Sequence, residues 1–197
     1  VMTKKYQLKD SEFHLKPAEL NKVVYAVPGF RDRCILKTFI QTGIRRAELA
    51  SLDIRDVDLE SRRLRIRDGK GAKERLIPIT DELGSDLSHL IGKRKTGPLF
   101  VSLRGGHIST RSLNRIVVQA GDLAGVKNPN PKYDGRLTCH LFRHSFARAW
   151  KSRGGSIESL SKILGHSSSA TTVDLYGTES MDDVQENYDR IMGEPIP

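Results

Sequence analysis

Two arginines follow a glycine in the segment 42–49, which reads Thr-Gly-Ile-Arg-Arg-Ala-Glu-Leu. The glycine ends one helical pattern and Arg45 begins the next, so a guanidinium stands beside the free N–H groups of a helix start. Both features attract phosphate. Glu48 follows Arg45 by three residues, and on a helix the two side chains share a face. We therefore expect Glu48 to hold Arg45, although an ordinary surface ion pair has the same spacing.

Two lysines lie in a glycine-rich turn between two predicted strands. Lys70 stands between Gly69 and Gly71, and Lys73 follows two residues later. A lysine at the tip of a tight turn can reach a substrate, and it can donate a proton where nearby cations lower its pKa. The alternative is a basic turn that is simply solvated.

Two histidines and an arginine are neighbours on a predicted helix. Positions 140, 143 and 144 share one face, so His140 and Arg143 are expected to converge. His140 and His144 also have the spacing of a zinc-binding helix, but position 141 is leucine where a metalloprotease has glutamate. Only His166 offers itself as a third ligand, so we expect no metal site. His144, next to two phenylalanines, can instead be a packed core residue.

His166 follows Gly165 at the expected end of a helix, and Tyr176 stands further along the chain. Tyrosine is a poor nucleophile at neutral pH because its pKa is about 10. It becomes useful where cations stabilise the phenolate or a base takes its proton. Most tyrosines serve only in packing, so Tyr176 alone indicates little.

The elements that must position these groups are mostly helices. Apolar spacing and capping residues predict helices over 17–27, 31–41, 80–90, 109–124, 140–153, 157–164 and 181–192, and shorter ones around 48–52 and 172–176. Between them, Leu59, Leu64 and Ile66 alternate with arginines as in a pair of strands, and 75–79 forms a third strand that Pro78 places at an edge. The predicted fold class is mainly α with one small antiparallel β-sheet (α+β).

The composition restricts the class of protein. A chain of 197 residues with 33 Lys and Arg against 24 Asp and Glu has a net charge of +9 and suits one domain with a polyanionic partner. Two cysteines exclude a disulfide framework and a four-cysteine zinc site. No apolar run approaches the ~20 residues of a membrane span, and no secretory signal opens the sequence. We expect a soluble, cytoplasmic protein associated with the nucleoid.

Taken in order, these clusters resemble the catalytic domain of the tyrosine recombinases, the phage integrase family. The matching stretches are TGIRRAEL, GKGAKERLIP, HLFRHSFA, LGHSSSATT and the downstream LY, which run from Thr42 to Tyr176 in family order. The resemblance implies the DNA breaking-rejoining catalytic-domain fold over residues 16–197. Residues 1–15 would be an arm or the remnant of a linker, and the family's N-terminal core-binding domain would be absent from this chain.

The resemblance also implies a set of site residues. The catalytic ones are Arg45, Lys70, His140, Arg143, His166 and Tyr176, with Glu48 in support. Lys73 is the alternative to Lys70 as the proton donor, because two lysines share that turn. Further contacts with DNA are expected from Arg46, Lys73, Arg75 and His144. One departure is that Gly177-Thr178 stands where many relatives carry a histidine two residues after the tyrosine.

The implied reaction is a transesterification at a DNA phosphodiester. Tyr176 Oη attacks phosphorus, a 3′-phosphotyrosyl link forms, and the 5′ oxygen leaves with a proton from Lys70. A 5′-hydroxyl of a second strand then reverses the step. Two guanidiniums would meet the charge that builds on the non-bridging oxygens, so no metal ion or other cofactor is implied.

The implied partner is double-stranded DNA, with self-assembly into a tetramer on paired sites. The amphipathic segment 181–192 either packs on its own domain or docks onto a neighbouring subunit in a cyclic exchange. Two other functions would use the same features. One is nicking and relaxation of DNA by a type IB topoisomerase-like enzyme, and the other is regulation by a DNA-binding protein that has lost turnover.

Overall fold

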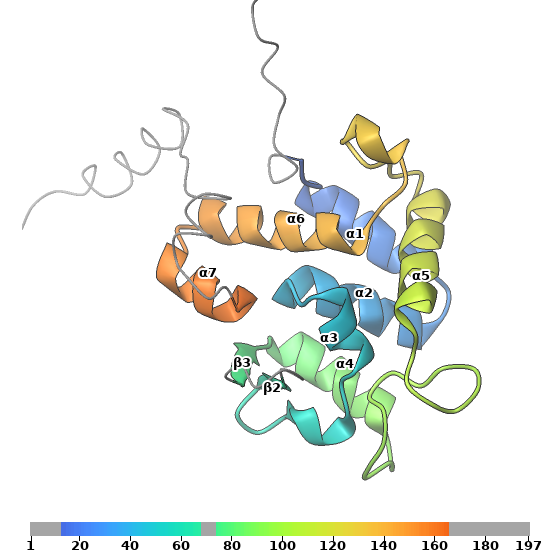
Figure 1. The fold of residues 1–197 in the computed structure, drawn as a ribbon, viewed down its shortest axis with the longest axis vertical. Helices are drawn as coiled ribbons and strands as arrows, with labels where there is room; N and C mark the ends of the chain where they lie inside the picture. The colour runs from blue at the N-terminus through green and yellow to red at the C-terminus, as the bar shows by residue number, and fades with distance from the viewer. Residues whose placement is uncertain (1–12, 68–73, 166–197) are drawn as a thin grey trace, which may run out of the picture.

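The computed structural model describes residues 13–67 and 74–165 (Figure 1). Its α-helices are α1 (Pro17–Ala26), α2 (Phe30–Thr42), α3 (Arg46–Ala50), α4 (Asp81–Ile91), α5 (Thr110–Ala124), α6 (Cys139–Ser152) and α7 (Ile157–Leu164). Two short 3-10 helices are η2 (Ile54–Asp56) and η3 (Pro131–Tyr133), and the strands are β1 (Val57–Asp58), β2 (Arg63–Ile66) and β3 (Arg75–Pro78).

The helices pack around α2. This helix contacts α1, α4 and α6, while α5 packs on α1 and α7 packs on β3. Figure 1 shows α6 lying across the molecule above α2, with α4 and the sheet below. Phe39 of α2 and Phe142 of α6 are fully buried, and their ring centroids lie 6.3 Å apart. This contact brings the C-terminal half of α2 and the N-terminal half of α6 together.

Most helix starts are set by local capping. Ser and Thr oxygens that precede helices accept a hydrogen bond from the N–H three residues later: Thr80 from Leu83, Ser109 from Ser112, Thr138 from Leu141 and Ser156 from Ser159. Thr80 and Ser109 are the N-caps of α4 and α5, in agreement with the helices expected over 80–90 and 109–124.

The sheet is antiparallel in the order β1-β2-β3, so β3 lies at an edge, as Pro78 predicts. Leu64 of β2 lies opposite Ile77 of β3, and both side chains are buried. The expected strand position of Leu59 is wrong. This residue lies in the turn between β1 and β2 and its side chain is 41% exposed. The α+β class with one small sheet is confirmed.

Two boundaries differ from the expectation. The short third helix ends at Ala50, before Leu52, which is nevertheless buried. Phe13 packs on the core, and Leu15 is 3% exposed with its N–H donating to Ser145 Oγ at 2.9 Å. Residues 13–15 are thus part of the packed domain rather than of an arm.

Several predicted elements lie outside the described residues: the turn 69–71 and the helices at 172–176 and 181–192. Of the helices in the described parts of the chain, none combines the length and apolar character that crossing a membrane requires.

Candidate active site

The turn after α2 sets the position of Arg45. Gly43 ends α2 in the left-handed conformation, with φ 60° and ψ 20°, and its N–H donates to the Phe39 carbonyl. Two residues later Arg45 is the N-cap of α3. Its N–H donates to Glu48 Oε2 at 2.8 Å, and its Nη1 donates to Glu48 Oε1 at 2.9 Å. The predicted pairing of Arg45 with Glu48 is confirmed.

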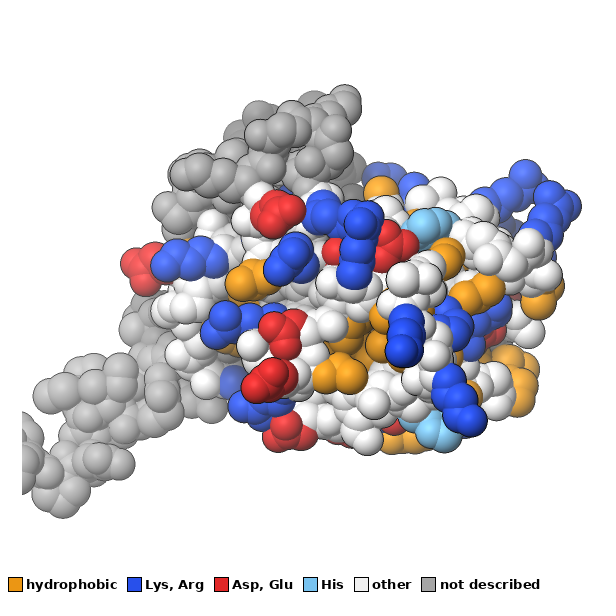
Figure 2. Space-filling view, turned by 90° about the horizontal axis from the view of Figure 1, so that it is seen from below, with side chains coloured by type: hydrophobic (Ala, Val, Ile, Leu, Met, Phe, Trp, Pro, Cys, Tyr) orange, Lys and Arg blue, Asp and Glu red, His pale blue; other side chains and the backbone are white. Residues whose placement is uncertain are grey.

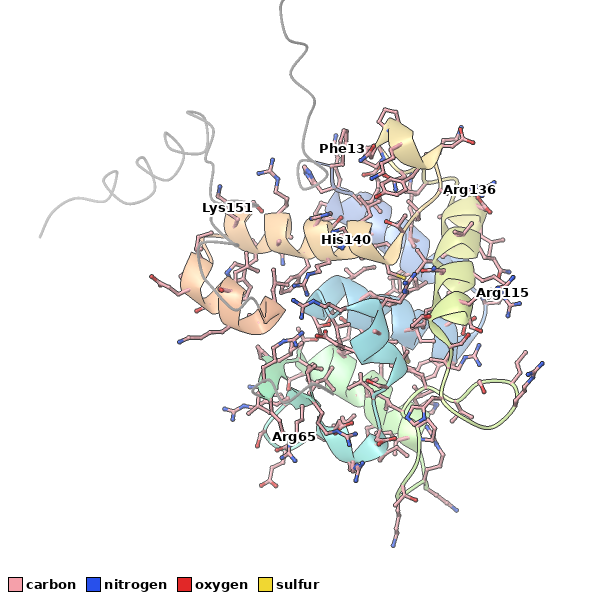
Figure 3. The ribbon with its side chains drawn as sticks, in the orientation of Figure 1. Phe13, Arg65, Arg115, Arg136, His140 and Lys151 are labelled. Carbon is pink, nitrogen blue, oxygen red and sulfur yellow. The ribbon has the colours of Figure 1, made fainter. Side chains whose placement is uncertain are left out.

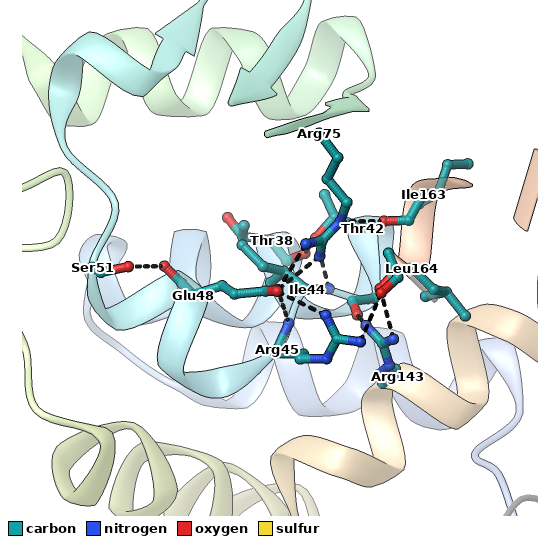
Figure 4. A network of polar contacts seen from close by, with 12 residues as sticks. Thr38, Thr42, Ile44, Arg45, Glu48, Ser51, Arg75, Arg143, Ile163 and Leu164 are labelled. Carbon is teal, nitrogen blue, oxygen red and sulfur yellow. Dashed lines mark hydrogen bonds and ion pairs between the residues drawn. The ribbon is translucent and has the colours of Figure 1, made fainter. Parts of the chain in front are cut away.

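The same carboxylate binds a second arginine. Arg75 Nη1 and Nη2 donate to the two oxygens of Glu48, each at 2.8 Å, in a bidentate pair (Figure 4). Burial alone would raise the pKa of the Glu48 carboxyl. The hydrogen bonds and charge of Arg75, together with the hydrogen bonds from Arg45, outweigh it and lower this pKa. Glu48 is therefore a fixed anion between two guanidiniums.

The last turn of α7 is held by three arginines. Helix C-termini carry a partial negative charge and unpaired carbonyls, which cations stabilise. Here three consecutive carbonyl oxygens each accept a hydrogen bond from a different arginine: Ile163 from Arg75 Nε at 2.9 Å, Leu164 from Arg143 Nη2 at 2.8 Å and Gly165 from Arg45 Nη2 at 3.0 Å. The contacts place the backbone that leads into His166 beside all three guanidiniums.

Arg143 is the buried member of this group. It lies on α6, is 5% exposed, and donates through Nη1 to the Gly43 carbonyl at 2.7 Å. It thus ties the turn before Arg45 to the end of α7 (Figure 4). The Arg45 side chain, in contrast, is 44% exposed.

The rings of His140 and His144 on α6 are in contact with each other. The ring centroids of His140 and His144 lie 4.2 Å apart in an edge-to-face arrangement. His140 is exposed, whereas His144 is 4% exposed. His144 is therefore packed in the core beneath His140. Because it is buried, a role in supporting the His140 ring is favoured over the direct DNA contact that the sequence led us to expect for His144. Within 13–67 and 74–165, no three His, Cys, Asp or Glu side chains gather as a metal-binding group.

A cleft of about 610 Å³ lies beside these residues. It is lined by Ile44, Arg45, Arg46, Ala47, Asn114, Val118, Tyr133, Arg136, Leu137, Thr138, Cys139, His140 and Arg143. Four arginines and a histidine are on this list, and the described residues contribute no Asp or Glu to it. Figure 3 labels two of the lining residues, His140 on α6 and Arg136 in the segment before it. The cleft suits a phosphate group.

The structure brings together only part of the predicted set. Arg45, Arg46, His140 and Arg143 share the cleft. Lys70, Lys73, His166 and Tyr176 lie outside the described residues. Arg75 does not line the cleft, and its side chain is 15% exposed. These positions favour a supporting role for Arg75 over the expected DNA contact.

Asn114, Tyr133 and Arg136 line the cleft but are not among the site residues expected from the sequence. Tyr133 lies in η3, within a segment that the sequence marks only as a loop. No motif or periodicity singles it out, because its place in the cleft depends on how that loop folds over α5 and α6.

Comparison with known proteins agrees with the geometry. The sequence model of the phage integrase family matches residues 14–182. The "Tyrosine recombinase XerC" of Pelobacter propionicus is 35% identical over 167 residues, which cover 82% of this chain and 52% of that protein. The protein of the same name from Syntrophus aciditrophicus is 33% identical over 174 residues, covering 82% and 53%. The chain spans about half the length of these relatives.

Solved structures give the same result. The crystal structure of XerA recombinase superposes with a TM-score of 0.76 at 28% identity, covering 93% of this chain and 66% of that one. The XerH site-specific recombinase bound to its difH substrate gives 0.73 at 25% identity, covering 93% and 55%. With a family match over most of its length and relatives above 30% identity, the chain belongs to the phage integrase family of tyrosine recombinases.

Proposed function

We propose that residues 13–197 are the catalytic domain of a site-specific DNA recombinase that cuts and rejoins strands through a 3′-phosphotyrosyl intermediate. The observation that carries the proposal is the cleft. Arg45 and Arg143 come from distant parts of the chain, yet they line one cleft together with His140 and without a carboxylate from the described residues. Such a site suits a phosphodiester whose negative charge increases in the transition state.

The two arginines differ in how they meet the phosphate. Glu48 and the Gly165 carbonyl fix Arg45 while leaving its side chain half-exposed to the cleft. Arg143 is held from behind by two carbonyls and reaches the cleft from α6. Because both guanidiniums are already fixed, they stabilise developing charge without reorganising during the reaction.

The chemical step needs residues beyond the described ones. Tyr176 Oη forms a bond to phosphorus while the bond from phosphorus to the 5′ oxygen breaks. Lys70, or Lys73 in its place, gives its proton to that oxygen, and His140 takes or relays the proton of the tyrosine. His166 adds a hydrogen bond to the phosphate. His166 is bonded directly to Gly165 in the chain, and the Gly165 carbonyl accepts a hydrogen bond from Arg45, which supports a place for His166 near the cleft.

Double-stranded DNA is the proposed partner. The net charge is +9, and the XerH relative was solved on its difH substrate. Figure 2 shows Lys and Arg side chains spread among Asp and Glu on one face, so the positive charge there forms no single patch. The four arginines of the cleft are a denser positive site, and we place the scissile phosphate there.

The test is covalent capture on nicked DNA. Nicked duplexes with a randomised central sequence are incubated with the chain, and adducts that survive detergent are isolated and their DNA is sequenced. We expect adducts with the wild type and with Tyr25→Phe, an exposed tyrosine of α1, but none with Tyr176→Phe. Absence of any adduct, or an adduct with Tyr176→Phe, contradicts the proposal.

The enriched sequence then tests assembly. We propose a tetramer on paired sites, formed by exchange of the segment 181–192. Deleting the residues after Gly177 should reduce assembly on paired sites and leave single-site binding nearly unchanged. Equal loss of both contradicts the exchange. Relaxation of a supercoiled plasmid that lacks paired sites would instead favour the topoisomerase-like activity.

A further inference from the structure

Among the described residues, Arg75 donates three hydrogen bonds, and each joins it to another part of the candidate active site. We propose that Arg75 is a positioning residue of the strand-cleavage reaction, which holds Arg45 through Glu48 and holds the last turn of α7 against both. The inference rests on the proposed function, and it gives Arg75 a positioning role in place of the DNA contact expected from the sequence.

The first argument is how Glu48 is bonded. Each of its two carboxylate oxygens accepts one hydrogen bond from Arg75 and one from Arg45, so four donors surround it. The Glu48 side chain is 16% exposed, which leaves little room for water to replace a lost donor. Without Arg75 the carboxylate keeps only the two donors of Arg45 itself, so the anion that orients the Arg45 guanidinium is held less firmly.

The second argument is the contact with α7. Arg75 Nε donates to the Ile163 carbonyl at 2.9 Å, one helical residue before the carbonyl that binds Arg143. The guanidinium also packs against Gly165: a Cβ added there would lie 2.8 Å from Arg75 Cδ, Nε and Cζ. Gly165 has a φ of 65°, which favours glycine, and a larger residue there would also displace the Arg75 side chain. The turn that leads into His166 therefore rests on Arg75.

The third argument separates positioning from DNA contact. Arg75 is 15% exposed and does not line the cleft, whereas Arg45 is 44% exposed and does. Its hydrogen bonds to Glu48 and Ile163 use all three guanidinium nitrogens, Nε, Nη1 and Nη2. Lysine, a single point charge, cannot reproduce this arrangement.

The experiment compares Arg75→Ala and Arg75→Lys with the matched control Arg33→Ala. Arg33 also donates to two backbone carbonyls beyond the end of a helix, those of Val27 and Pro28, on the α1–α2 side of the domain. Cleavage at saturating DNA and DNA affinity are measured separately, on the nicked duplex recovered from the adducts.

We expect both Arg75 variants to cleave about 10–100-fold more slowly, the usual effect of losing an outer partner of a site. Their DNA affinity should change less than about 3-fold, since the phosphate contacts remain. Arg33→Ala should cleave like the wild type. Added guanidinium ion, at a concentration that does not unfold the protein, should restore part of the cleavage by Arg75→Ala and leave that of Arg33→Ala unchanged. Wild-type cleavage by the Arg75 variants, or equal loss of affinity and rate, overturns the proposal.

A second readout does not depend on DNA. NMR titration of the Glu48 carboxyl should show a higher pKa in Arg75→Lys than in the wild type, and no change in Arg33→Ala. An unchanged Glu48 pKa overturns the positioning role even if Arg75→Ala does not fold. If the wild type forms no DNA adduct but the Glu48 pKa rises as expected, the proposed function fails while the coupling of Arg75 to Glu48 stands.

Discussion

Arg143 Nη1 donates a hydrogen bond of 2.7 Å to the carbonyl oxygen of Gly43, a residue 100 positions earlier in the chain. The bond fixes α6 to the turn that carries Arg45. Its geometry depends on the positive φ of Gly43 and on the close packing of Phe146 and Leu164 around that glycine. The proposed phosphate site and the core thus share this turn.

Replacing Gly43 by alanine should destabilise the protein by about 2–4 kcal/mol. Part of the cost, about 1–2 kcal/mol, is the left-handed backbone. The rest is overpacking, because the added Cβ would lie 2.6 Å from Phe146 Cδ1 and 2.9 Å from Leu164 Cδ2. Gly125→Ala is the matched control: Gly125 has φ 63° but no atom within 4 Å of an added Cβ. Urea unfolding that gives equal losses for both variants would contradict this packing.

Arg45 and Arg143, the two arginines proposed to bind the phosphate, should differ in their effects on stability. Arg143→Ala leaves the buried carbonyls of Gly43 and Leu164 without this donor and should cost about 2–4 kcal/mol. Arg45→Ala removes a half-exposed side chain and should cost about 1 kcal/mol or less. Both should slow DNA cleavage about 10²–10³-fold. Thermal unfolding measured beside adduct formation checks the contrast, and a similar loss of stability for the two variants would refute it.

The sequence predicts the local parts of this site and not the tertiary ones. Thr80 and Ser109 are recognisable as caps because a cap depends on residues three positions away. The pair of Arg45 with Glu48 is local in the same sense. The bond between Arg75 and Glu48 spans 27 positions and joins β3 to α3, two elements that only the tertiary fold brings together. No periodicity carries that information.

Helical spacing also identifies which residues share a face of a helix, but not which of them are buried. It correctly places His140 and Arg143 together, yet His144 on the same face is buried. The difference arises because α6 packs against α2 and α7, which covers one side of that face. Leu59 shows the converse: alternation continues into the turn, where no partner strand covers the side chain.

Part of the loss of folding stability at acidic pH should come from protonation of Glu48. A carboxyl whose pKa is lower in the folded state stabilises the fold above its unfolded pKa, here 4.5, and this contribution is lost as the pH falls through the folded value. Glu48→Gln should therefore be less stable than the wild type at neutral pH, and the difference should shrink below pH 4.5. Urea midpoints measured from about pH 7 to pH 3 test this. A difference that stays constant across the range would show that Glu48 is not held as described.

Both thiols should be unreactive in the folded chain. Burial raises the pKa of Cys34 and of Cys139 to about 12, so very little thiolate is present at pH 8. Labelling with iodoacetamide should be at least about 100-fold slower than in urea, where both cysteines should react. Cys139 lines the cleft, so its rapid labelling without urea would show that the start of α6 opens.

The most direct test of the central claim is to identify which tyrosine carries DNA. The adduct formed with nicked DNA is digested with protease and nuclease, and the nucleotide-bearing peptide is sequenced by mass spectrometry. The chain has five tyrosines, and the cleft of Arg45, Arg143 and His140 is predicted to load DNA onto Tyr176 alone. DNA on Tyr133, which lines the same cleft, or on any of the other three tyrosines would contradict the proposed mechanism.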